Sequence, residues 1–206
     1  DVSEYDLDES LLGKVYKTRL DPEKYEFNTL YVNDERATMA RTRNRDNNPF
    51  FPMAKGEYMR STGGHNNDLN MYYNAADLDE KTIQGMVHAQ ERGEEEIAQV
   101  FVWDGGDWDW FTNTVPIATI STENSEFKFP EPPADYPEKY RTKYNIGTGA
   151  RYFLQGNLAF MDVEGEYHYN KSTGTIYYYP KAEDGAIEEQ TIIVPTMQTA
   201  VYFKGA

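Results

Sequence analysis

Short runs of β-branched and aromatic residues, separated by glycine, proline, asparagine and aspartate, set the main constraint on the fold of this chain. Each run is shorter than about eight residues, which is the length of a strand rather than of a helix. Strands are expected at 14–20, 71–73, 97–103, 108–113, 115–121 and 126–130. The pattern therefore predicts a mostly β fold, either a β-sandwich or a partly open β-barrel, with one short helix.

The segment EKTIQGMVHAQER has the periodicity of that helix. One face would carry Ile83, Met86, Val87 and Gln90, and we expect this face to lie against a sheet. Asp79 can accept hydrogen bonds from the first N–H groups, and Gly93 can end the helix. Gly85 is the residue in this segment that least favours a helix.

Two stretches have the pattern of β-hairpins. In LYVNDERATM, the arms would be 30–32 and 37–39, joined through Asn33-Asp34, because these residues tolerate positive φ. In GEYHYNKSTGTIYYYP, the arms would be Glu166–Tyr169 and Thr175–Tyr179. Their connection would be a turn that ends on Gly174 in the left-handed conformation and forms a bulge.

The second hairpin is rich in tyrosine, which raises the question of a sugar-stacking platform. Alternation places Tyr167 and Tyr169 on one face of the first arm, and separates Tyr178 from Tyr177 and Tyr179 in the second arm. A platform needs its rings on one exposed face, so this distribution favours packing on both sides of the hairpin. Tyr167 and Tyr169 remain candidate carbohydrate-binding residues.

Composition limits the classes of function. Aromatic residues make up 15% of the 206-residue chain, which indicates a folded domain. The formal charge of −15 opposes nucleic-acid binding and favours a neutral polysaccharide, a neutral oligosaccharide or a cationic partner. The absence of cysteine removes disulfides and thiol catalysis. No apolar run reaches the roughly 18 residues that span a bilayer, so no membrane partner is expected.

The segment WDGGDWDW, at 103–110, contains the sharpest candidates for ligand binding. Trp108 and Trp110 are two residues apart and would share one face of a strand, so together with Trp103 they are candidate carbohydrate-stacking residues. The alternative is that these rings are part of the core.

The same segment contains a weak metal candidate. Asp104, Asp107 and Asp109 lie on or beside a glycine-containing loop and could supply oxygen ligands to Ca²⁺. Solvated loop carboxylates are the alternative, and no cofactor is otherwise expected.

Two arginines occur in the first hairpin region of this acidic chain. Arg36 and Arg41 could form ion pairs with the abundant carboxylates. They could instead dock the domain onto a neighbouring domain or reach a substrate cleft.

Sequence motifs of common catalytic sites are missing. The chain contains no HExxH, GxSxG, P-loop or dinucleotide-binding fingerprint, and we name no catalytic residue. A paired-carboxylate glycosidase site cannot be located from the number of acidic residues.

Two stretches resemble bacterial enzymes that act on carbohydrates and fold as right-handed parallel β-helices. In LYVNDERATMARTRN the matching positions are Leu30, Tyr31, Val32, Asn33, Arg36, Ala40, Arg41 and Asn44. Further along, the matching positions lie at Asn157-Leu158, in MDVEGEYH (161–168) and in TGTIYYYP (173–180). The chain is most similar to glycoside hydrolase family 141 and its relatives. It departs from their pattern at Asp34, Arg43, Glu164 and Tyr167-His168.

The resemblance implies a non-catalytic accessory domain, inserted into a β-helix glycoside hydrolase that degrades polysaccharides. Residues 1–190 would form the inserted β domain, and residues 191–206 would return as the first strand of a β-helix that this chain lacks. The expected partners are that β-helix domain and a polysaccharide, and the expected location is extracellular or periplasmic in a bacterium. The alternatives are an independent carbohydrate-binding module and a small glycosidase with a carboxylate pair. The start at Asp1, without methionine, suggests a segment of a longer protein.

Overall fold

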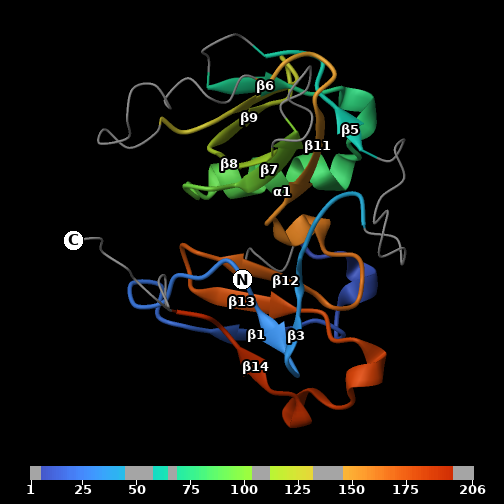
Figure 1. The fold of residues 1–206 in the computed structure, drawn as a ribbon, viewed down its shortest axis with the longest axis vertical. Coiled ribbons are helices and arrows are strands. Elements are labelled where there is room, and N and C mark those ends of the chain that lie inside the picture. The colour runs from blue at the N-terminus through green and yellow to red at the C-terminus, as the bar shows by residue number, and fades with distance from the viewer. Residues whose placement is uncertain (1–5, 45–57, 65–68, 104–111, 132–145, 197–206) are drawn as a thin grey trace, which may run out of the picture.

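The computed structural model describes residues 6–44, 58–64, 69–103, 112–131 and 146–196. Within these ranges the chain is mostly β, with four small sheets and one α-helix (Figure 1). The described strands close no barrel, and the arrangement is that of a β-sandwich-like domain. The predicted fold class is therefore confirmed.

The upper half of Figure 1 contains two sheets and the helix. One sheet has the order β5 (Met59–Arg60), β11 (Arg151–Gln155), β7 (Ala98–Trp103) and β8 (Thr112–Ile117), and is antiparallel throughout. The other has the order β6 (Asn70–Tyr72), β10 (Glu126–Lys128) and β9 (Thr119–Ser121). Both sheets share a core with α1 (Glu80–Glu91).

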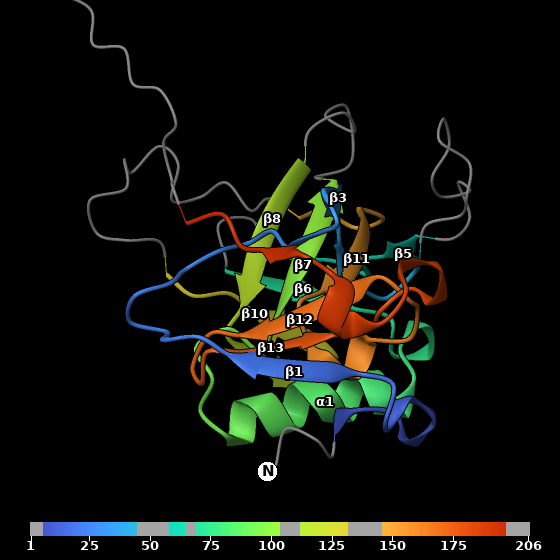
Figure 2. The same cartoon turned by 90° about the horizontal axis from the view of Figure 1, so that it is seen from below.

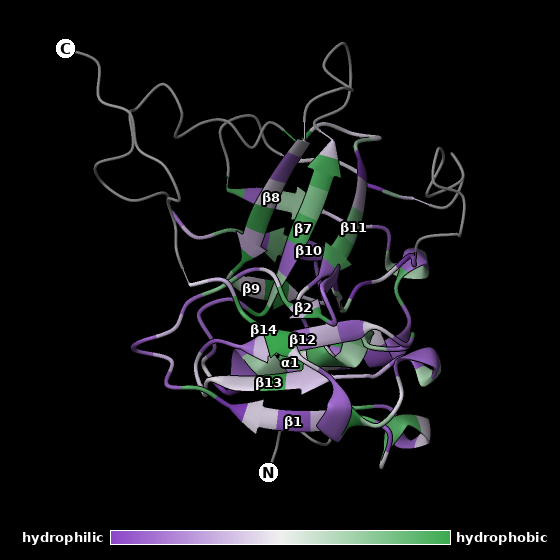
Figure 3. Cartoon of the chain, turned by 60° about the horizontal axis from the view of Figure 1, so that its bottom comes forward, coloured by the Kyte–Doolittle hydropathy of each residue, from purple (hydrophilic) through white to green (hydrophobic). Residues whose placement is uncertain are grey.

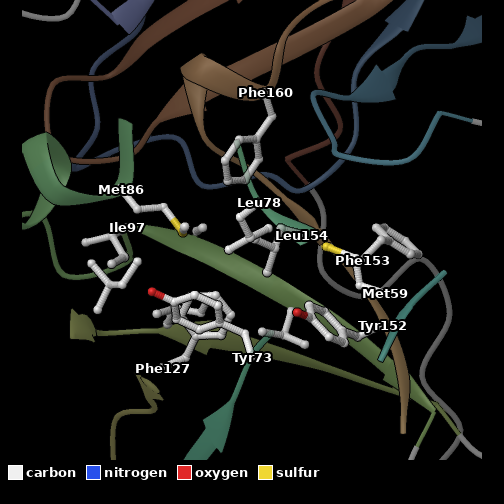
Figure 4. Packing of buried hydrophobic residues seen from close by; sticks show 14 of the residues in the cluster. Met59, Tyr73, Leu78, Met86, Ile97, Phe127, Tyr152, Phe153, Leu154 and Phe160 are labelled. Carbon is white, nitrogen blue, oxygen red and sulfur yellow. The ribbon is translucent and has the colours of Figure 1, made fainter. Parts of the chain in front are cut away.

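Buried apolar side chains fill this core (Figure 4). Strand β7 contributes Val100 and Val102, both fully buried, and its apolar character stands out in Figure 3. The rings of Tyr73 and Phe127 stack with their centroids 4.5 Å apart. The main core is therefore aromatic as well as aliphatic.

The helix forms where the periodicity predicted it. The Asp79 carboxylate accepts a hydrogen bond from the Thr82 N–H at 2.8 Å, and Gly93 follows the helix with a φ of +73°. Met86 is fully buried, and Ile83 and Val87 pack against the core at its margin. The helix runs below the sheets in Figure 2.

Asn157 joins three elements at the helix. Its Nδ2 group donates to the Gly85 carbonyl at 3.2 Å and to the Ile97 carbonyl at 2.8 Å, while its Oδ1 accepts from the Ala159 N–H. This network fixes the single turn η5 (Leu158–Phe160) against α1. The other single turns are η2 (Glu9–Leu11), η3 (Ala75–Asp77), η6 (Ala182–Asp184) and η7 (Ile187–Glu189).

The lower half is built on the tyrosine-rich hairpin. The sheet order is β1 (Tyr16–Arg19), β13 (Thr175–Tyr178), β12 (Glu166–Asn170) and β4 (Thr38–Met39), with β4 parallel to β12. Gly174 ends the hairpin turn with a φ of +71°. A small antiparallel sheet of β14 (Ile192–Ile193), β2 (Tyr31–Val32) and β3 (Glu35–Arg36) lies beside it.

Each face of the hairpin packs against a different core. Tyr167 and Tyr178 belong to a small core with Phe27 and Leu30. Tyr177, on the opposite face, belongs to the main core. The alternation therefore correctly predicted tyrosines buried on both sides.

Two strand predictions need correction. The hairpin turn at Asn33-Asp34 has positive φ at both residues, as predicted, but its second arm is β3, directly after the turn, and not 37–39. Residues 38–39 pair instead with β12, a contact across more than 100 positions that local pattern cannot reveal. The expected strand 115–121 is divided between β8 and β9.

Candidate functional site

One face of the sheet β5-β11-β7-β8 carries a layer of partly exposed aromatic and polar side chains. In β7, period-two alternation directs Val100 and Val102 into the core and Phe101 and Trp103 to the opposite face. Phe153 of β11 pairs with Phe101 in the ladder. We call this outer layer the aromatic floor, defined by Phe101, Trp103, Phe153 and Tyr58; Phe153 is only 5% exposed, and the other three rings are half-buried.

The rings of the aromatic floor contact one another. Phe101 and Phe153 stack with centroids 4.9 Å apart and planes 11° from parallel. Trp103 packs edge-on against Phe101 at 5.0 Å and against Tyr58 at 4.8 Å. Such pairs stabilise each other by about 0.5–1.5 kcal/mol beyond the burial of area. The rings are therefore held in place by their neighbours.

Cationic side chains lie on this floor. The Arg41 guanidinium lies 3.5 Å from the centroid of the Phe153 ring. The Arg151 guanidinium lies 5.1 Å from the Trp103 ring and 5.7 Å from the Tyr58 ring. All three distances are within the range of cation–π attraction, about 6 Å.

The opposite wall comes from the chain around β3 and β4. It contributes Arg36 to Met39, and Asn28, Thr29 and the edge of Tyr167 complete it. Between wall and floor lies a groove of about 850 Å³, which is large enough for a small oligosaccharide or a comparable ligand. We call it the aromatic groove.

The aromatic groove ends at an ion pair. Lys171 Nζ lies 3.2 Å from Glu96 Oε1, and both residues line the groove. They also line a second hollow of about 840 Å³, whose wall includes Glu26, Glu94 and Glu95. The second hollow is acidic, whereas the aromatic groove combines ring faces with cations.

A buried carboxylate fixes the segment after β4 that carries Arg41. Glu166 is 2% exposed and accepts hydrogen bonds from the backbone N–H groups of Arg41, Asp162 and Val163 at 3.2, 3.0 and 3.3 Å. Burial raises the pKa of Glu166 to about 7, and the three N–H donors act in the opposite direction. Its role is to hold the backbone of Arg41 and the turn before β12.

His168 is the other strongly perturbed group. It is 6% exposed, and burial lowers its pKa to about 4, so the ring is neutral near pH 7. It lies beside Tyr177 at a centroid distance of 6.0 Å and lines the acidic hollow.

The structure brings four of the candidate residues together. Trp103, Arg36, Arg41 and Tyr167 all line the aromatic groove, although Tyr167 is only 2% exposed and its hydroxyl donates to the Asn28 carbonyl. Tyr169 does not line the aromatic groove.

Tyr169 is half-buried in the lower half of the molecule. Its ring stacks on Phe27 at 4.2 Å, and its hydroxyl donates to the Tyr25 carbonyl at 2.8 Å. The remaining candidates, Trp108, Trp110, Asp104, Asp107 and Asp109, lie outside the described residues.

Several groove residues were not predicted from the sequence. They are Tyr58, Phe101, Phe153, Gln99, Gln155, Glu96 and Lys171, and Arg151 lies beside them over the Trp103 ring. The signal was present in AQVFVW and RYFLQ, where alternation puts amide, aromatic and arginine side chains together on one face. Gln155 Nε2 donates to Gln99 Oε1 at 2.8 Å, which continues the ladder of side chains beyond the rings.

Within the described residues, two further kinds of feature are absent. No group of three histidine or acidic residues in those ranges is arranged to hold a metal ion. No helix there is long and apolar enough to cross a membrane.

Comparison with known proteins gives a structural match. One solved structure, described as "Glycoside hydrolase", matches with a TM-score of 0.62 and 17% sequence identity. The chain shares the fold of part of a glycoside hydrolase. The match covers 91% of this chain but 30% of the other, so this chain spans less than a third of that protein's length. No family model matches the chain, and no curated protein matches it.

Proposed function

We propose that this chain is a non-catalytic accessory domain of a polysaccharide-degrading glycoside hydrolase, and that its aromatic groove contacts the saccharide. The observation that carries the proposal is the aromatic floor, a layer of fixed rings lining an open groove. Rings of this kind stack on the C–H faces of sugars, and partly exposed aromatic patches commonly mark binding sites. The fold shared with part of a glycoside hydrolase is consistent with this role.

The scarcity of acidic residues in the described lining of the groove favours binding over hydrolysis. The described lining contains one carboxylate, that of Glu96, and it is engaged with Lys171. Glycoside hydrolysis ordinarily needs two carboxyl groups about 5–10 Å apart. The purified chain is therefore expected to show no glycosidase turnover, and measurable turnover that copurifies with it would contradict the proposal.

The wider setting follows from the sequence resemblance. In this proposal the domain packs on a parallel β-helix of the parent enzyme and forms one side of the substrate cleft. The parent would be a secreted or periplasmic bacterial enzyme. Arg36 and Arg41, which belong to the resembling stretch, line the groove and would face the substrate.

Binding of saccharides to the purified chain tests the proposal. Calorimetry with a panel of plant and algal oligosaccharides should identify at least one ligand, and Trp103→Ala should lower its affinity about tenfold. Tyr16→Ala is the matched control, because Tyr16 is an aromatic residue on the exposed edge strand β1 and does not line the groove. Equal losses in the two variants, or no binding to any saccharide, would refute a role for the groove.

An independent carbohydrate-binding module is the second candidate. It is favoured by the fact that this chain supplies both a floor and a facing wall to the groove. A module should bind as tightly in isolation as within its parent enzyme, whereas a domain that forms one side of a cleft should bind more weakly in isolation. Comparing the dissociation constants of the two forms distinguishes them.

A further inference from the structure

Two glutamines continue the aromatic floor along the same face of the sheet. Gln99 pairs with Gln155 across β7 and β11, as Phe101 pairs with Phe153. Period-two alternation directs all four side chains to one face, and both glutamines line the aromatic groove. Two residues along a strand span about 7 Å, so the pair of amides begins about 7 Å from the pair of rings.

Hydrogen bonds join these amides into a chain with one direction, which we call the amide chain. Gln99 Nε2 donates to Glu96 Oε1 at 3.0 Å, and Gln155 Nε2 donates to Gln99 Oε1 at 2.8 Å. Glu96 is ionised in its pair with Lys171, and a carboxylate only accepts hydrogen bonds. Gln99 must therefore turn its NH₂ group toward Glu96 and its carbonyl toward Gln155. Gln155 in turn must direct its own NH₂ group toward Gln99.

This direction leaves an acceptor at the free end of the amide chain. Among the described residues, Gln155 Oε1 receives no hydrogen bond, and the Gln155 side chain is half-buried. The described buried oxygen atoms that lack a hydrogen-bond partner belong to Tyr152 and Gln190, so Gln155 Oε1 is an accessible atom. A neutral carbonyl oxygen accepts a hydrogen bond from a hydroxyl group, which is the donor that a saccharide offers.

We propose that Gln155 is a specificity-determining residue of the aromatic groove, whose Oε1 accepts a hydrogen bond from a saccharide hydroxyl group beside the sugar that stacks on Phe101 and Trp103. This inference rests on the proposed function, because it assumes that the groove binds saccharide. It assigns the half-buried rings to affinity and the amide to recognition of an O–H group. An analogue without that O–H group binds more weakly, because it covers the acceptor without pairing with it.

Calorimetry in which protein and ligand are changed together tests the inference. The probes are cellohexaose, xylohexaose and a galactose hexasaccharide, each in native form and fully O-methylated, which removes the O–H donors and keeps the sugar rings. Gln155→Leu should lower the affinity for a native probe about three- to tenfold and leave that for its methylated form unchanged. Gln84→Leu, the same change on the exposed face of α1 outside the groove, should alter neither. If another saccharide of the panel binds instead, its native and methylated forms replace the hexasaccharides.

The direction of the amide chain has a test that needs no ligand. In Gln155→Glu a carboxylate oxygen would face Gln99 Oε1, so this variant should melt about 2–4 °C below Gln155→Leu. With the opposite direction, the carboxylate would accept from Gln99 Nε2, and Gln155→Glu would be the more stable of the two. That result would overturn the inference, because Gln155 would then present an N–H donor to the groove.

The outcomes separate this inference from the proposed function. A loss in Gln155→Leu that is confined to native probes supports the inference. An equal loss for native and methylated probes, or no loss, overturns the role of Gln155 and leaves the saccharide groove intact where Trp103→Ala still weakens binding. Methylated probes that do not bind the parent chain also overturn the inference, because stacking would then not supply the affinity. Absence of binding to the native probes and to the wider panel overturns both proposals.

Discussion

Replacing Gly85 by alanine should destabilise the protein, although the same change in most helices is stabilising. Gly85 lies inside α1, where alanine normally gains about 1 kcal/mol over glycine. Here an added Cβ would lie 2.2 Å from the Ala159 Cβ and 2.9 Å from Asn157 Oδ1. Neither neighbour can move cheaply, because both belong to the buried network that joins η5 to the helix.

The size of this destabilisation follows from two costs and one gain. Overpacking a close contact costs about 1–3 kcal/mol, and disturbing the buried Asn157 hydrogen bonds costs about another 1–3 kcal/mol. Subtracting the gain in helix propensity leaves a net loss of about 1–5 kcal/mol in the free energy of unfolding, with a central value of about 3 kcal/mol. At that central value the melting temperature of a chain of this size should fall by roughly 6–12 °C.

Chemical denaturation followed by circular dichroism measures this change. Adding Ala159→Gly to Gly85→Ala removes the atom in closest contact and should recover part of the loss, which a double-mutant cycle would record as positive coupling. Gln84→Ala, on the exposed face of the same helix, is the control and should change stability by less than about 0.5 kcal/mol. A Gly85→Ala protein that is more stable than the parent would refute the close packing of α1 on η5.

Three further predictions concern stability. Asp79→Ala should cost about 1 kcal/mol, measured by urea denaturation, because it removes the hydrogen bond to the Thr82 N–H; no change would exclude a capping role. Gly174→Ala should cost more than about 2 kcal/mol in the same assay, since the residue has a φ of +71° and its Cβ would lie 2.0 Å from the Leu20 carbonyl oxygen; a neutral result would refute that turn geometry. Because the pKa of Glu166 is raised to about 7, this residue contributes stability to the folded state at pH values below 4.5, its ordinary pKa. That contribution, up to about 3 kcal/mol, is lost as the pH rises toward 7. The lowered pKa of His168, about 4, acts oppositely, since its contribution is present above 6.5 and lost as pH falls toward 4. The parent should therefore be nearly constant in stability between pH 4.5 and 6.5, whereas Glu166→Gln should gain stability as pH rises; identical profiles would contradict the assignment.

Local pattern predicted most elements of the fold. Helix α1, the turn at Asn33-Asp34 and both arms of the tyrosine-rich hairpin follow from periodicity and turn chemistry over a few neighbouring residues. The pairing of segments that are distant in the sequence did not follow from local pattern. Strand β4 pairs in parallel with β12, and Arg41 forms a bridge with Gln155, so this short segment links the two halves of the molecule. Such contacts depend on the global topology, which no local window contains.

The candidate site was predicted in part for the same reason. Trp103, Arg36 and Arg41 were each identified from their own segment, and the structure places them in one groove. Phe153 was not identified, because in sequence it is one apolar residue in a strand. Its place in the aromatic floor depends on contacts with Phe101, which stacks beside it, and with Arg41, which lies over it. Both of those residues are more than 50 positions away in the sequence.

The difference between the two aromatic surfaces lies in what covers them. The tyrosines of the β12–β13 hairpin are packed from both sides, by the small core around Phe27 and by the main core, so their rings stabilise the fold. In the floor of the aromatic groove, Phe101, Trp103 and Tyr58 are half-buried, whereas Phe153 is covered by the Arg41 guanidinium and is only 5% exposed. Rings held by their neighbours in such a position need little further ordering when a ligand binds, which lowers the entropic cost of association. Aromatic rings therefore serve stability in the hairpin, whereas those of Phe101 and Trp103 on β7 are partly accessible for recognition.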